Sequence, residues 1–105
     1  MSSRHRARER SLQILFEWDA RKAGANLAKH GVSFLQATMA FQDRFAVEFL
    51  DDSEDYGEDR FKLIGSMGDE LLTVAFTERA ERIRIISARR AMKDEKEYYN
   101  SQNTL

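Results

Sequence analysis

The sequence contains no cysteine and no proline among its 105 residues, and only five glycines. Without cysteine, neither a disulfide nor a thiolate metal site is possible, which is consistent with a reducing compartment. The absence of proline favours regular elements joined by short connections. No apolar run approaches the ~20 residues that span a membrane. The basic N-terminus lacks the apolar segment of a signal peptide, so the sequence predicts a cytoplasmic protein without membrane contact.

A net excess of charge is also missing, because the formal net charge is only -1 although 33% of the residues are charged. The hydrophobic content of 42% is sufficient for the core of one domain. The charges are segregated along the chain. Acidic residues gather in one predicted loop: Asp51, Asp52, Glu54, Asp55, Glu58 and Asp59. Cations without any acid follow later: Arg82, Arg84, Arg89, Arg90 and Lys93. A compact basic element of this kind is a candidate site for a polyanion such as phosphate.

The order of predicted elements indicates an α+β fold. Hydrophobic periodicity predicts strands at 12–16, 45–50, 60–66, 70–77 and 82–87, and helices at about 20–30, after residue 33 and at 90–100. Asp19 and Ser33 are expected to cap the first two helices, and Gly31 to end the first. Met67-Gly68-Asp69 suits a tight hairpin. We therefore expect an antiparallel sheet with two N-terminal helices and one C-terminal helix.

Several motifs occur in a characteristic order. They are Phe16-Glu17-Trp18-Asp19, then Asn26 to Phe34, Glu58-Asp59-Arg60-Phe61, Thr77-Glu78-Arg79, and Arg82 to Ala91. Over residues 15–105 the chain resembles the BrnT family of toxins from bacterial type II toxin–antitoxin systems. The resemblance implies a compact variant of the RelE-type ribonuclease fold. It also implies an endoribonuclease that needs no metal or other cofactor and slows growth by cutting cellular RNA.

The same resemblance implies a protein partner. This would be a BrnA-type antitoxin with a ribbon-helix-helix domain, forming a heterotetramer with the toxin. Operator DNA would be bound only through the antitoxin. Residues 1–14 lie outside the family pattern and are expected to form a basic extension, flexible or helical. Residues 4–15 instead resemble the opening helix of the NusB antitermination factor. Met92 departs from the small polar residue that usually caps the last helix of the family.

RNA cleavage without a metal needs a base, an acid and cations that stabilise the phosphorane charge. Arginine suits the last role because its planar fork grips two phosphate oxygens. Arg84, Arg89 and Arg60 are the candidates. The alternatives are an ion-paired sheet arginine for Arg84 and a helix-start surface charge for Arg89. For Arg60 the alternative is a salt bridge to Glu58 or Asp59.

Glu78 completes the predicted catalytic set, either as the base or as a carboxylate that positions arginines. Arg90 and Lys93 are candidate substrate-binding residues. Tyr99 could stack on a base or donate a proton, with packing of the last helix as the equal alternative. His30 has the intrinsic pKa of a general acid or base. Because it ends a predicted helix, a structural interaction with the helix dipole is the favoured interpretation.

The acidic loop is not predicted to bind calcium. Asp51, Ser53 and Asp55 have the spacing of an EF-hand, but the required glycine is displaced to Gly57 and Lys62 stands at the last ligand position. No histidine cluster offers a zinc site. The sequence therefore favours a BrnT-like ribonuclease toxin without a metal. The alternatives are a non-enzymatic interaction protein that docks a partner through the basic strand and helix, and an RNA-binding module.

Overall fold

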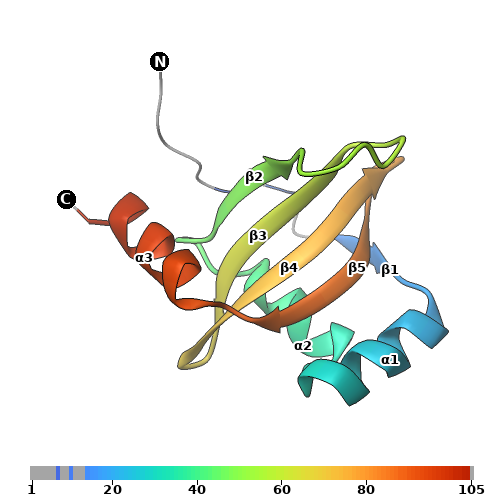
Figure 1. Ribbon diagram of the computed structural model, residues 1–105, viewed down its shortest axis with the longest axis horizontal. Coiled ribbons are helices and arrows are strands. Elements are labelled where there is room, and N and C mark those ends of the chain that lie inside the picture. Colours follow the sequence, from blue (N-terminus) through green and yellow to red (C-terminus); the bar gives the residue numbers. More distant parts are fainter. Residues whose placement is uncertain (1–6, 8–9, 11–13, 105) are drawn as a thin grey trace.

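The computed structural model describes residues 7, 10 and 14–104, which form a five-stranded sheet and three helices (Figure 1). The elements follow in the order β1 (Leu15–Glu17), α1 (Ala20–His30), α2 (Phe34–Ala40), β2 (Val47–Asp51), β3 (Arg60–Met67), β4 (Glu70–Arg79), β5 (Arg82–Arg90) and α3 (Lys93–Gln102).

The strands lie in the order β1-β5-β4-β3-β2. The three pairs among β2, β3, β4 and β5 are antiparallel, as expected. β1 departs from this pattern because it pairs with β5 in parallel. A parallel pair needs a crossover, which the chain supplies through both helices and the other strands. The α+β class, with two helices before the hairpins and one after them, is confirmed.

The two N-terminal helices begin where the sequence places their caps. Asp19 Oδ1 accepts hydrogen bonds from the backbone N–H groups of Arg21 at 2.8 Å and Lys22 at 3.1 Å. Gly31 ends α1 in the left-handed conformation, with φ of 69°, which glycine adopts without steric cost. Ser33 caps α2 and exchanges reciprocal hydrogen bonds with Gln36. The predicted caps are therefore confirmed.

Strand boundaries agree less closely with the sequence analysis. The first strand covers Leu15–Glu17 where 12–16 was expected, and residues 12 and 13 lie outside the described residues. The strand that was expected at 45–50 lies at Val47–Asp51. The expected end of the last strand at residue 87 is wrong, because β5 continues to Arg90 and α3 begins only at Lys93.

The extension of β5 has a physical cause. Arg89 pairs with Thr73 and Arg90 pairs with Leu72 in the ladder with β4. The Ala91 N–H then donates to the Leu71 carbonyl at 2.9 Å. These backbone bonds hold the segment extended, so Arg89 and Arg90 are strand residues and not the start of a helix.

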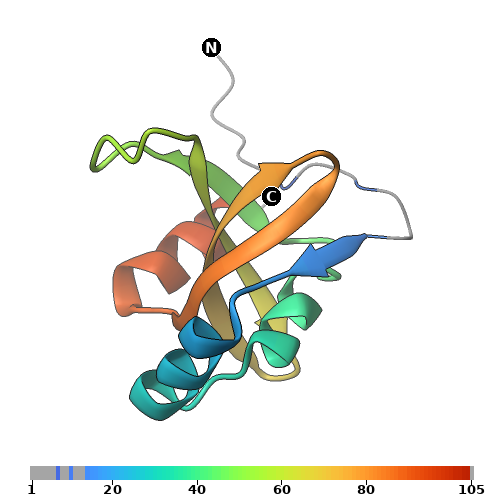
Figure 2. The same cartoon turned by 90° about the vertical axis from the view of Figure 1, so that its right-hand side faces the viewer.

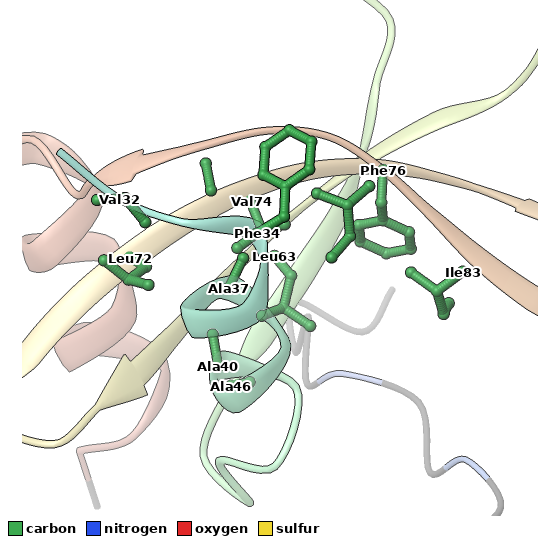
Figure 3. Close-up of a cluster of buried hydrophobic side chains, with 12 residues drawn as sticks. Val32, Phe34, Ala37, Ala40, Ala46, Leu63, Leu72, Val74, Phe76 and Ile83 are labelled. Atoms are coloured by element: carbon green, nitrogen blue, oxygen red, sulfur yellow. The ribbon is translucent and has the colours of Figure 1, made fainter. Parts of the chain in front are cut away.

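One face of the sheet carries the main core under α1 and α2. Phe34, Ala37 and Ala40 of α2 are fully buried against β3, β4 and β5 (Figure 3). The sheet meets α2 closely at Gly65, where an added Cβ would lie 2.3 Å from the Ala40 carbonyl oxygen. Glycine at this position therefore allows the helix to approach the sheet.

The other face is only partly covered. α3 lies on the side of the sheet opposite α2 (Figure 2) and packs over Val47 and Ile64. Between Ala75 and Phe76 the register with β5 shifts, which leaves Ile86 as the extra residue of a bulge. Beyond α3, none of the described helices packs on this face. We call this region the open face and define it by Glu17, Lys62, Ala75, Thr77, Arg84 and Ser87.

Candidate functional site

Arg84 lies on the open face between a carboxylate and a hydroxyl. Its register partners are Glu17 on β1 and Thr77 on β4, and paired residues share a face. Arg84 Nη1 donates to Glu17 Oε2 at 3.2 Å, and Arg82 Nη1 lies 3.7 Å from Glu17 Oε1. The Arg84 side chain remains 33% exposed. One guanidinium edge is therefore fixed by the protein, and the remaining N–H groups bond none of the described residues.

Lys62 lies in the neighbouring row of the same face. It pairs with Phe49 on β2 and with Ala75 on β4, which in turn pairs with Ser87 on β5. Lys62 is half-buried. Ala75 and Ser87 are small, so the face between the Lys62 and Arg84 positions has a floor of short side chains.

Arg60 lies two residues before Lys62, which places it on the same face of β3. Its Nε lies 3.3 Å from Glu58 Oε2, and its guanidinium lies 4.2 Å from the centre of the Tyr56 ring. Arg79 also donates to Glu58, at 3.0 Å. The hydrogen bond from Arg79, and after it that from Arg60, lowers the pKa of Glu58. The salt bridge to Glu58 considered from the sequence is therefore present.

Arg89 is held by a carboxylate of α3. Its two terminal nitrogens donate to Glu95 at 2.7 and 2.9 Å. Glu95 Oε1 also accepts from Thr73 Oγ1 at 2.9 Å and from the Met92 N–H at 2.8 Å. Burial alone would raise the pKa of Glu95, but the hydrogen bonds from Arg89, Met92 and Thr73 outweigh it and lower the pKa to about 2. Arg89 thus fastens α3 to β5.

Glu78 does not lie beside Arg84. Its register partner is Ile83, a core residue, so Glu78 is on the face that α1 and α2 cover. There it lies 3.7 Å from Arg10, whose guanidinium also pairs with Glu48 at 3.0 Å. The structure therefore separates Glu78 from the open face.

The predicted substrate-binding residues are dispersed. Arg90 donates to Glu70 at 2.7 Å and to the His30 carbonyl at 3.3 Å, at the C-terminal end of α1. Lys93 is the exposed first residue of α3.

Tyr99 of α3 makes a partly buried structural contact. Its hydroxyl donates to Asp43 Oδ2 at 2.6 Å, and the side chain packs against the cluster of Val47, Ile64 and Ala91. Burial, together with the bond to Asp43, raises the pKa of Tyr99. These contacts match the packing alternative for this residue.

Within residues 7, 10 and 14–104, no group of three or more histidine, cysteine, aspartate or glutamate side chains could hold a metal ion. In the same part of the chain, no helix is long and apolar enough to cross a bilayer.

Sequence reasoning missed two residues of the open face. Glu17 belongs to a motif that the resemblance used, but its place beside Arg84 depends on the parallel pairing of β1 with β5. Lys62 follows Arg60 at a spacing of two in a strand, and that alternation was a usable signal that both cations share a face.

The comparisons with known proteins give one result on the family. The family model described as "Ribonuclease toxin, BrnT, of type II toxin-antitoxin system" matches residues 18–95. No curated protein matches the chain. The match spans α1, α2, the strands β2 to β5 and the start of α3, and it leaves the NusB-like resemblance of the N-terminus outside. Since the model matches well over half of the sequence, the chain belongs to the BrnT family of ribonuclease toxins.

Proposed function

We propose that this chain is the toxin of a type II toxin–antitoxin system and cleaves cellular RNA on the open face of its sheet without a metal. Arg84 carries this proposal. It presents a guanidinium that Glu17 holds in place, on a part of the sheet that no described helix covers. A guanidinium fixed in this way is organised in advance to bind a phosphate and the charge that develops on it.

The reaction class that fits is transesterification within RNA. The ribose 2′-oxygen attacks the adjacent phosphorus, its proton passes to a base, and the bond from phosphorus to the 5′-oxygen breaks. The leaving oxygen takes a proton, and the products are a 2′,3′-cyclic phosphate and a 5′-hydroxyl end. Arg84 would stabilise the phosphorane charge, and Arg60 would contact the same RNA strand from β3.

Glu17 is the carboxylate best placed to accept the 2′-hydroxyl proton. It lies on the open face in contact with Arg84, whereas Glu78 lies on the opposite face of β4. The periphery of the site is the proposed place of the remaining candidate residues: Arg89, Arg90, Lys93, Tyr99 and His30. The bidentate bond to Glu95 favours a structural role for Arg89.

Cleavage in excess EDTA by the purified chain tests this proposal. The wild-type chain should cut RNA under chelation, because the charge stabilisation would come from arginine. Arg84→Ala and Glu17→Gln should each reduce the rate by about a hundredfold or more. Lys29→Ala is the matched control, since it removes an exposed cation of α1. Loss of cleavage on chelation, restored by magnesium, would contradict the arginine-based mechanism.

The partner in this proposal is a BrnA-type ribbon-helix-helix antitoxin that forms a heterotetramer with the toxin in the cytoplasm and alone contacts operator DNA. The exposed cations of β5 support an electrostatic encounter with an acidic segment of that antitoxin. The association rate should fall as salt rises above ~0.1 M, where the screening length is ~10 Å. Arg82→Glu should slow association as well, since the Arg82 side chain is 55% exposed. A rate that is independent of salt would instead indicate an apolar docking surface.

A further inference from the structure

We infer that Lys62 binds a second phosphate of the RNA strand, next to the one that is cleaved. This inference rests on the proposed function, because it assigns the scissile phosphate to Arg84. Lys62 would then contribute to affinity for the substrate and not to the chemical step.

The register places Lys62 and Arg84 at a suitable separation. The two residues lie on β3 and β5, with β4 between them, and their rows are two residues apart along the strands. Strand spacing and rise give a Cα separation of roughly 12 Å. Both side chains are long and carry their charge at the tip. They can therefore hold two phosphates of one strand that crosses the short side chains of Ala75 and Ser87.

The Lys62 side chain forms no ion pair and no hydrogen bond with the described residues, although its charge acts on Asp51. None of the ion pairs found among residues 7, 10 and 14–104 includes it, and it makes no hydrogen bond there. Arg60, Arg84 and Arg89 on neighbouring positions each pair with a carboxylate. Lys62 thus differs from the other cations of this face.

The hydrogen bond from the Ser53 hydroxyl and, to a smaller extent, the charge of Lys62 lower the pKa of Asp51, whose oxygens already accept hydrogen bonds. Asp51 Oδ1 accepts from the Ser53 hydroxyl at 2.7 Å and from the Ser53 N–H at 3.2 Å. Asp51 Oδ2 accepts from the Tyr56 hydroxyl at 3.4 Å. These bonds hold the carboxylate within the acidic loop, which leaves Lys62 to pair with an anion from outside. The Lys62 ammonium, at the tip of a long side chain on the open face, can therefore bind an anion without breaking an ion pair of the described residues.

Binding of an uncleavable 2′-O-methyl RNA strand at several salt concentrations tests the inference. Lys62→Met removes the charge and keeps the apolar stem, and Lys62→Arg retains the charge. Lys29→Met is the control for the loss of any lysine. We expect Lys62→Met to make the slope of log affinity against log salt shallower by ~0.7, the value for one phosphate contact with a single strand. Lys62→Arg and Lys29→Met should keep the wild-type slope. An unchanged slope in Lys62→Met would overturn the inference.

Steady-state cleavage kinetics distinguish a contact of Lys62 with the second phosphate from a contact with the scissile phosphate. Lys62→Met should raise KM by about tenfold, as expected for one lost charge-assisted hydrogen bond, with kcat unchanged. Two further substrates each carry one neutral methylphosphonate linkage, one substrate on the 5′ side of the cleavage point and the other on the 3′ side. With one of these two substrates, Lys62→Met and wild type should have the same KM, because the phosphate charge that Lys62 binds is absent. A fall in kcat at constant KM would place Lys62 at the scissile phosphate and refute the assignment. Failure of the wild-type chain to cleave any RNA would instead refute the proposed function.

Discussion

Replacing Glu95 by Gln should destabilise the protein at neutral pH, because the replacement removes the negative charge that Glu95 carries in the folded protein. Glu95 accepts hydrogen bonds from Arg89, Thr73 and the Met92 backbone, and its side chain is only 11% exposed. The pKa of Glu95 falls from 4.5 to about 2. That difference corresponds to about 3 kcal/mol of folding free energy, and solvent screening at the partly exposed Arg89 reduces it to about 2 kcal/mol.

The pH dependence follows from the direction of this pKa change. The pKa is lower in the folded state, so the contribution is complete above the unfolded-state value of 4.5 and is lost as the pH falls toward about 2. Urea unfolding at a series of pH values measures the free energy of unfolding for both proteins. The difference between wild type and Glu95→Gln should be about 2 kcal/mol at pH 7 and should approach zero near pH 2.

Glu97→Gln provides the control because Glu97 is an exposed residue of the same helix. It should change the free energy of unfolding by less than about 0.5 kcal/mol at every pH. A Glu95→Gln difference that stays constant from pH 7 to pH 2 would show that the lost charge is not its source. In that case the account of Arg89 as the residue that fastens α3 would fail.

Three further substitutions test packing, capping and the N-terminal segment, each by urea or thermal unfolding. Gly65→Ala should cost about 3 kcal/mol or more, because the added Cβ would overlap the Ala40 carbonyl oxygen and force α2 away from the sheet. Met92→Ser should stabilise the protein by about 1 kcal/mol, since Met92 is 53% exposed and its side chain makes no capping hydrogen bond. Arg10→Met should destabilise the protein by about 1 kcal/mol or more, because it removes the 3.0 Å ion pair between Arg10 and the poorly exposed carboxylate of Glu48. A stability unchanged from wild type in any of the three variants would contradict the structural reason given for that variant.

The two N-terminal helices could be predicted from the sequence because their signals are local. The side chains of Asp19 and Ser33 bond backbone groups two or three residues away, and Gly31 adopts a conformation that its own residue type favours. Such signals depend on no distant partner. The same holds for the hairpin at Gly68, where φ is 68°.

The position of Glu78 could not be predicted because its turn carries no typical turn residue. Ala80 and Glu81 both have positive φ, of 47° and 67°, as in a two-residue hairpin turn that glycine or asparagine would usually occupy. This turn aligns Glu78 with Ile83 and thereby fixes its face. A glycine at position 81 would have indicated the turn. Counting back from that turn along β4 would then have placed Glu78 on the face opposite Arg84.

The remaining features of the site depend on long-range pairing. Charge alone suggests that Arg89 begins a basic helix, but the ladder to Thr73 keeps it in the strand. Glu17 reaches Arg84 only because β1 lies parallel to β5 at the edge of the sheet. Long-range strand pairing of this kind overrides local propensity, and local patterns in a single sequence do not indicate it.

The parallel pairing of β1 with β5 also determines when the open face can exist. β5 lies between β1 and β4, and the bond from Arg84 to Glu17 joins positions 67 residues apart. During synthesis β1 leaves the ribosome early, but its partner strand is nearly the last element to emerge. Contacts of such long range form late in folding. A chain interrupted before β5 therefore contains the Glu17 carboxylate without the Arg84 guanidinium, and the site proposed on the open face is not assembled in an incompletely translated chain.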